Sequence, residues 1–189
     1  ITMRTLRFLC IILIVTIFNV ASTLAQGFQP PPEGKSVIYF VNVKKTNSRE
    51  YFHQDRYIGL LKRGKNYMRY VCNPGENLFW ASAENKKFVT ANLKEGGTYI
   101  VIGENKMGMW SAGIRLIPIT DDNKLFEKAR AIIMEKGPIV TPVSTIKLRN
   151  TELVEFIANV LDHYENQWKS TKDFPNISAE MAIPVDKLK

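Results

Sequence analysis

The sequence has few residues of the kinds that build catalytic and metal centres. It contains two cysteines and two histidines among 189 residues. So few thiol and imidazole groups, spread along the chain, offer none of the ligand spacings that zinc sites use. The chain also lacks a glycine-rich loop that could cradle phosphate and the GxSxG turn of serine hydrolases. We therefore predict no metal site, no cofactor and, as the first interpretation, no enzymatic activity.

Long apolar runs are also scarce, and the longest lies near the start of the sequence. It extends from Phe8 to Phe18, follows two arginines and precedes the small, mildly polar residues 19–25. This order is typical of a secretory signal peptide, whereas a membrane-spanning helix needs about 20 mostly apolar residues. We predict that residues 1–25 are a signal peptide cleaved after Ala25. The mature protein is then exported to the periplasm or beyond and carries no transmembrane segment.

Acidic residues are scarce in one segment of the chain. Residues 35–69 contain nine lysines and arginines against two acidic residues, whereas residues 70–189 contain 15 of each sign. Clustered positive charge attracts anionic surfaces. We expect a hairpin tip around Gly64, and the candidate contact residues on and beside it are Arg56, Lys62, Arg63, Lys65 and Arg69.

Because we expect the protein to be exported, the candidate partners of these basic residues are molecules of the cell envelope. They are acidic lipid head groups or anionic envelope polymers, and nucleic acid is not expected outside the cytoplasm. The alternative is a solvated hairpin whose charge only aids solubility.

After a proline-rich spacer, residues 26–35, the pattern becomes one of short strands. β-Branched and aromatic residues alternate with polar ones, and turn residues recur about every ten positions. The expected strands are residues 36–44, 50–53, 57–62, 66–72, 77–82, 87–93, 98–104 and 114–120. Seven or eight such strands predict a mainly β domain over residues 36–120, folded as an antiparallel β-sandwich.

In residues 121–189 the apolar residues recur at the spacing of a helix and no longer at that of a strand. This pattern predicts a helical C-terminal extension with two helices. The first is expected to begin at Asp121 and Asp122 and to end before Gly137. An extended link over residues 139–148 follows. The second helix is expected over residues 150–168, with Asn150 as its N-terminal cap. Its apolar positions recur at intervals of three and four, so it should pack on the β-domain.

The stretch CNPGENLFW contains the only cysteine that remains in the predicted mature chain. Pro74 and Gly75 suit the two central positions of a tight turn, so we expect a hairpin between the flanking strands. Strand alternation places Cys72 on an apolar face, as a small buried residue. Phe79 and Trp80 must point to opposite faces, and we expect a C-terminal helix to cover one of them.

The rival function is a hydrolase with an unrecognised site, which uses Cys72 as the nucleophile or a carboxylate that the sequence does not identify. A thiol nucleophile needs a base, and nothing in the sequence places His53 or His163 beside it. A disulfide with another chain also stays open, because an odd cysteine in an oxidising compartment permits one.

Several of these strand and turn segments share a known pattern. They are Lys35–Phe40, Tyr57–Lys62, Tyr70–Glu76, Leu78–Ala81, Leu93–Ile100 and Arg115–Pro118. Together they resemble the bacterial family called domain of unknown function 2846. The resemblance implies an exported envelope domain with an immunoglobulin-like or related β-sandwich over about residues 35–120.

Members of this family are often lipoproteins, but no cysteine follows the apolar run here in a lipobox setting, so we predict no lipid anchor. The family has no established activity to carry over. The predicted function is therefore a binding or structural module of the cell envelope, with an unidentified envelope component as its partner.

Overall fold

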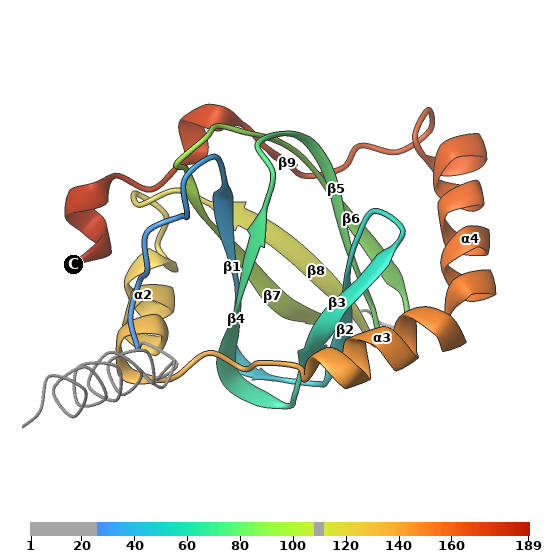
Figure 1. Cartoon of the computed structure of the whole chain (residues 1–189), viewed down its shortest axis with the longest axis horizontal. Helices are drawn as coiled ribbons and strands as arrows, with labels where there is room; N and C mark the ends of the chain where they lie inside the picture. The colour runs from blue at the N-terminus through green and yellow to red at the C-terminus, as the bar shows by residue number, and fades with distance from the viewer. Residues whose placement is uncertain (1–25, 108–111) are drawn as a thin grey trace, which may run out of the picture.

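The computed structural model describes residues 26–107 and 112–189 of the chain, so the predicted signal peptide lies outside the described residues. Two β-sheets pack face to face between helices (Figure 1). Sheet one contains, in spatial order, β4 (Gly64–Cys72), β1 (Ser36–Thr46), β7 (Thr98–Met107) and β8 (Ala112–Ile119). Sheet two contains β3 (Arg56–Leu61), β2 (Arg49–His53), β5 (Gly75–Ser82), β6 (Lys86–Leu93) and β9 (Asn176–Ile177). The prediction of a mainly β sandwich with eight strands before residue 120 is confirmed.

Strand β1 shows why the molecule has more than two layers. Its residues from Ser36 to Val43 are all buried, so both faces of the strand are covered. Ile38 and Phe40 point into the space between the sheets. Tyr39 and Val41 point the other way, towards helix α2 (Phe126–Glu135). An unbroken apolar strand is typical of a sheet that is buried on both faces.

Helix α4 (Val154–His163) covers the opposite side of the sandwich. With the π-helical turn Tyr164–Trp168 it packs on the outer face of sheet two. Trp80 lies there, stacked on Phe52 with ring centroids 3.8 Å apart, while its neighbour Phe79 points between the sheets. The expectation that a C-terminal helix covers one of these two aromatic residues is confirmed. The layers run α2, sheet one, sheet two, α4 (Figure 1).

Two predicted hairpins are wrong. Strands β3 and β4 lie in different sheets, and so do β4 and β5. The turns at Gly64 and at Pro74 therefore carry the chain from one sheet to the other. The chain bends at Pro74, and Gly75 has the positive φ, 89°, that the expected turn requires, but turn chemistry alone does not specify which strands pair. The sheets are also not wholly antiparallel, because β1 pairs with β7 and β6 with β9 in parallel.

The helices differ from the prediction in number and in their starting points. Three α-helices, not two, occur in the described C-terminal part, because α3 (Val143–Glu152) forms where an extended link was expected. None of its residues is buried, so it has no apolar period for sequence analysis to detect. Asn150 lies in its last turns and does not cap a helix. Helix α2 begins at Phe126, after turns at residues 121–125, so Asp121 and Asp122 do not cap it.

The outer edges of β3 and β4 are covered by the segment around α3. The Asn150 side-chain amide accepts from the Tyr57 N–H at 2.9 Å and donates to the Tyr57 carbonyl at 3.0 Å. Ile139 N–H donates to the Tyr67 carbonyl on β4 at 2.7 Å. Such cover prevents an edge strand from pairing with another chain. Within the described residues, no helix is both long enough and apolar enough to cross a membrane.

Candidate functional site

Cys72 ends strand β4 inside the layer between the two sheets. Its side chain is 6% exposed, and the sulfur lies 3.9 Å from the Ser36 carbonyl oxygen. Burial raises the pKa of the Cys72 thiol to about 12, against a smaller opposing effect of Lys35. The thiol is therefore protonated at neutral pH, and a protonated thiol is a poor nucleophile. The expectation that Cys72 is a buried residue is confirmed.

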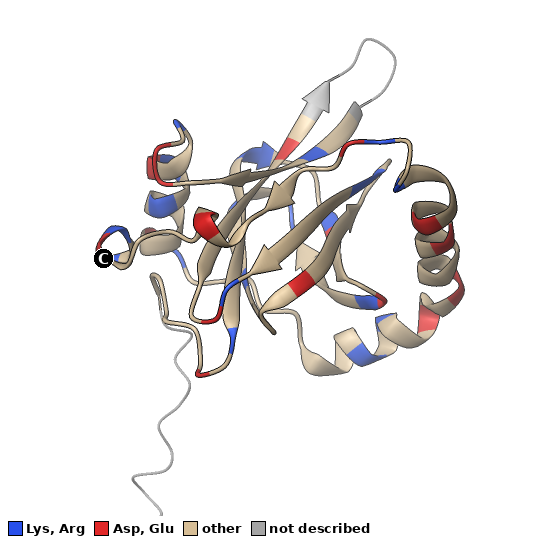
Figure 2. Cartoon of the chain, turned by 90° about the horizontal axis from the view of Figure 1, so that it is seen from above, with Lys and Arg blue, Asp and Glu red and all other residues tan. Residues whose placement is uncertain are grey.

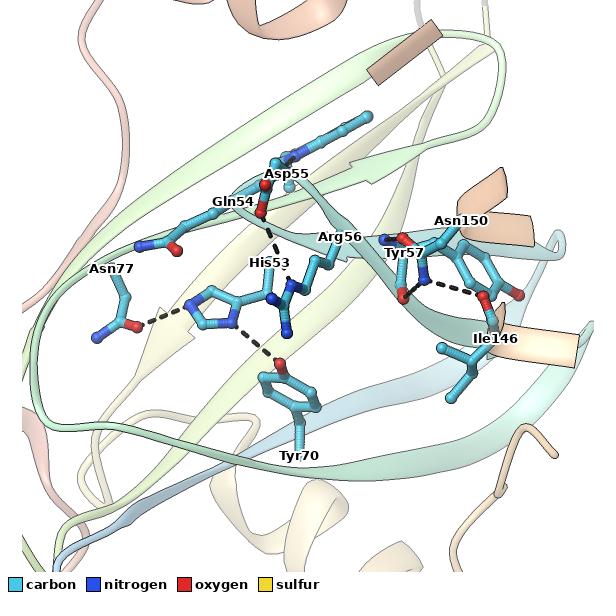
Figure 3. Close-up of polar contacts among 10 residues, drawn as sticks. His53, Gln54, Asp55, Arg56, Tyr57, Tyr70, Asn77, Ile146 and Asn150 are labelled. Atoms are coloured by element: carbon cyan, nitrogen blue, oxygen red, sulfur yellow. Dashed lines mark hydrogen bonds and ion pairs between the residues drawn. The ribbon is translucent and has the colours of Figure 1, made fainter. Parts of the chain in front are cut away.

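His53 lies near Cys72, and the two residues line one hollow of about 370 Å³. The His53 ring is held from both sides (Figure 3). Nε2 lies 2.7 Å from Asn77 Oδ1, and Nδ1 lies 3.0 Å from the Tyr70 hydroxyl. The ring also stacks on Phe79 at 4.6 Å between centroids. These four residues come from β2, β4 and β5 in two different sheets, so sequence spacing gave no sign that they meet.

The hydrogen bonds of Asn77 fix the tautomer of His53. Asn77 Nδ2 donates to the Gly75 carbonyl at 2.8 Å and to the Asn73 carbonyl at 3.2 Å. Its Oδ1 must then face His53 and accept a hydrogen bond from the Nε2–H group. In the neutral ring Nδ1 has no proton and accepts from the Tyr70 hydroxyl.

Burial of this cluster favours neutral side chains. Burial lowers the pKa of His53, and the nearby Arg56 guanidinium acts in the same direction, against the Asn77 hydrogen bond and Asp55. Burial raises the pKa of Tyr70 to about 12. At neutral pH the cluster is thus an uncharged, fully hydrogen-bonded set. Because both ring nitrogens are engaged, His53 is not placed to take a proton from Cys72, and the pair that a thiol hydrolase needs is not formed.

The five predicted basic contact residues occupy three places. Lys62, Arg63 and Lys65 lie together at the crossover from β3 to β4. Arg56 lies at the other end of β3, at the rim of the His53 hollow and 4.0 Å from Asp55. Arg69 is half-buried in the middle of β4, where its Nη2 donates to the Pro30 carbonyl at 3.1 Å. The structure therefore brings three of the five together and separates the other two.

Two further lysines, Lys45 and Lys136, lie at the same end of the molecule as Lys62, Arg63 and Lys65. The β1–β4 register places Thr46 opposite Gly64, which brings Lys45 to this end of the sandwich. Lys136, just after α2, donates from Nζ to the Lys65 carbonyl at 2.6 Å. We call the exposed residues Lys45, Lys62, Arg63, Lys65 and Lys136 the basic end. The basic end lies at the lower edge of Figure 1, where strand β4 begins and where the segment after α2 passes the start of that strand.

No ion pair within the described part of the chain involves a residue of the basic end. Met134 and Val140, which flank Lys136 in the sequence, are exposed by 39% and 57%. Acidic residues gather elsewhere, above all on the outer surface of α4 and its flanks (Figure 2). The exposed acidic residues there are Glu152, Glu155, Asp162 and Glu165. The positive charge of the basic end is thus not neutralised by neighbours.

The described residues contain no group of three or more histidine, cysteine, aspartate or glutamate side chains that could hold a metal ion. No protein-family model matches the chain, and no curated protein matches it. The resemblance to domain of unknown function 2846 therefore stays a prediction.

Proposed function

We propose that the protein is an exported, non-enzymatic module of the cell envelope that docks on anionic lipid head groups through its basic end. The observation that carries this proposal is the meeting of five exposed cationic side chains, from β1, the β3–β4 crossover and the end of α2, without a carboxylate partner. Export rests on the signal peptide predicted at residues 1–25. The proposal includes the immunoglobulin-like form of the sandwich that the family resemblance implies.

The energetics favour a reversible, salt-sensitive contact. Each basic residue close to an anionic membrane surface contributes about 1 kcal/mol. Five of them suffice for a measurable association without a lipid anchor. The exposed side chains of Met134 and Val140 beside Lys136 add apolar area that can enter the interface between head groups and acyl chains. The acidic surface of α4 is repelled by the same membrane, so it points away from the lipid.

The test is co-sedimentation of residues 26–189 with vesicles of phosphatidylglycerol and phosphatidylcholine. The chain should bind these vesicles and not vesicles of phosphatidylcholine alone. Replacement of Lys62, Arg63 and Lys65 by serine should weaken binding about a hundredfold, because three contributions of about 1 kcal/mol are lost. Binding should also fall between 0.1 and 1 M salt, as the Debye length shrinks from about 10 Å to about 3 Å.

A matched control removes the same charge elsewhere. Lys94, Lys128 and Lys147 are exposed and lie outside the basic end, so their replacement by serine should leave vesicle binding nearly unchanged. Equal binding by the two triple variants would contradict the proposal. Binding to a soluble polyanion such as dextran sulfate, with none to vesicles, would assign the basic end to an envelope polymer and reject the lipid.

A further inference from the structure

Two hollows beside strand β8 adjoin each other and share part of their lining. The first, of about 550 Å³, lies between β8, β6 and the segment from Trp168 to Pro175. The second, of about 640 Å³, lies between β8 and the turn that precedes α2. Arg115, Leu116 and Pro175 line both. We call the combined feature the β8 groove, and each half has the volume of an ordinary small-molecule site, about 300–1,000 Å³.

The two halves of the β8 groove differ in chemistry. The first half is mainly apolar: the half-buried rings of Trp168 and Phe174 line it, together with Phe88, Ile114 and Leu116, which are almost fully buried. The Phe88 ring centroid lies 5.7 Å from those of both Trp168 and Phe174. The second half is more polar than the first: Lys44, Glu104, Asn123, Lys124 and Asn176 line it together with Ile117, Pro118 and Leu125. A ligand that fills both halves must therefore have an apolar part and a polar part.

The charge of the groove specifies the sign of the polar part. Six cationic side chains line it: Lys44, Lys86, Lys87, Arg115, Lys124 and Lys172. Only two carboxylates oppose them, Glu104 and Asp173, which leaves a net charge of +4. Glu104 is shared by Arg115 at 3.0 Å and Lys44 at 3.5 Å, so one carboxylate serves two cations. Lys172 Nζ lies 4.3 Å from the centre of the Trp168 ring, which places a cation beside the apolar half.

The edge of β8 is poorly suited to an added peptide strand. The Ile114 N–H already donates to Asn85 Oδ1 at 3.0 Å, away from β7. Strand geometry repeats every two residues. The backbone polar groups of Leu116 and Pro118 therefore point away from β7, as those of Ile114 do. Pro118 has no N–H to donate, and proline is a common means of blocking an edge strand. Of these three outward positions only Leu116 keeps an N–H for a partner strand, and one such bond does not hold a peptide.

We propose that the β8 groove binds a single-chain amphiphile with an anionic head group, such as a long-chain fatty acid. The acyl chain lies on Trp168 and Phe174, the two half-buried aromatic residues of the first half, where burial of apolar area drives binding. The carboxylate lies in the second half, where Arg115 and Lys124 can donate charge-assisted hydrogen bonds. This site is separate from the basic end and does not depend on the proposed membrane contact.

The experiment is a calorimetric titration of residues 26–189 with myristate below its micelle concentration. We expect saturable binding of one molecule per chain. Tetradecyltrimethylammonium has the same chain length and the opposite charge, and it should bind much more weakly. The variant in which Lys62, Arg63 and Lys65 are serine should bind myristate as the wild type does, so failure of the membrane proposal leaves this result unaffected.

Two kinds of variant test the two halves of the groove. Lys124→Glu and Arg115→Glu should each weaken myristate binding about tenfold or more, because a hydrogen bond between charged groups is lost and a repulsion is added. Phe174→Ser should weaken it by loss of apolar contact. Lys124 and Arg115 are exposed, and Lys124 forms no ion pair among the described residues. Lys124→Glu therefore remains informative even if Arg115→Glu disturbs Glu104.

Three results would overturn the proposal. The first is wild-type affinity for myristate in both glutamate variants. The second is equal binding of the cationic and anionic amphiphiles, which would mean a detergent-like apolar contact. The third is absence of myristate binding together with binding of an oligoglutamate peptide that Arg115→Glu abolishes, which would assign the groove to an acidic peptide.

Discussion

His53 has surroundings that stabilise its neutral form in the folded chain. Its ring lies against Phe79 and between Tyr70 and Asn77, and all its hydrogen-bonding capacity is used in the neutral state. Burial lowers the pKa of His53 below the usual 6.5. In the unfolded chain the ring regains its ordinary pKa. The unfolded state therefore takes up a proton at a higher pH than the folded state does.

This difference predicts a pH dependence of stability. The contribution of His53 is fully present above pH 6.5, and it is lost as the pH falls from there through the lower folded pKa. Urea denaturation at pH 7.5 and pH 5.0 should show a smaller loss of unfolding free energy on acidification in His53→Gln than in the wild type. The glutamine keeps a polar side chain between Tyr70 and Asn77. An NMR titration that finds the His53 pKa above 6.5 would contradict this prediction.

At the scale of elements, the contrast between α4 and α3 shows what the sequence could predict. The apolar stripe of the second predicted helix, including Ile157, Val160 and Tyr164, was visible as a period and is buried on sheet two. Helix α3 has no buried residue and is attached largely through polar contacts. The strands were predictable because alternation is local. Their pairing was not, because the turns at Gly64 and Pro74 suit a sheet-to-sheet crossover as well as a hairpin.

The candidate sites also divide into a part that the sequence could predict and a part that it could not. The excess of basic residues within 35–69 could be counted in the sequence. That count identified Lys62, Arg63 and Lys65 as candidate contacts with anionic surfaces. Lys45 and Lys136 join them only through the register of β1 with β4 and the path of the chain after α2. The β8 groove combines residues 44 to 176. Contacts over such separations depend on topology, and a local pattern holds no information about them.

Asn150 provides a test of how α3 is held. Its amide replaces a neighbouring strand by bonding both the N–H and the carbonyl of Tyr57. Asn150→Ala leaves these two part-buried backbone groups without a partner, so we expect a loss of about 1–3 kcal/mol in unfolding free energy. Asn159→Ala, at an exposed position of α4, should change stability by less than about 0.5 kcal/mol. Equal effects in urea denaturation would mean that the edge of β3 needs no cover.

At the scale of the whole molecule, both sheets are apolar on both faces. One cluster lies between sheet one and α2, a second between the sheets, and a third between sheet two and α4. All three include residues from both sides of position 120, so apolar contacts cross the predicted boundary between residues 36–120 and 121–189. Phe52, Trp80 and Phe88 would be uncovered if α4 came away. A contiguous aromatic patch of that kind promotes association between chains.

The double substitution Ile157→Asp and Val160→Asp tests this dependence in residues 26–189. Each carboxylate would have to be buried against Phe88 and Tyr164 or else force α4 off the sheet, because an unpaired buried charge is costly. We expect α4 to detach, 1-anilinonaphthalene-8-sulfonate to bind the uncovered aromatic surface, and the protein to elute from size-exclusion chromatography as oligomers. Ala158→Asp and Asn159→Asp place the same two charges on the exposed face of α4 and should leave the protein monomeric and the dye unbound. If the buried-face variant were also monomeric and did not bind the dye, sheet two would not need α4, and the apolar stripe of that helix would be free to bind a partner.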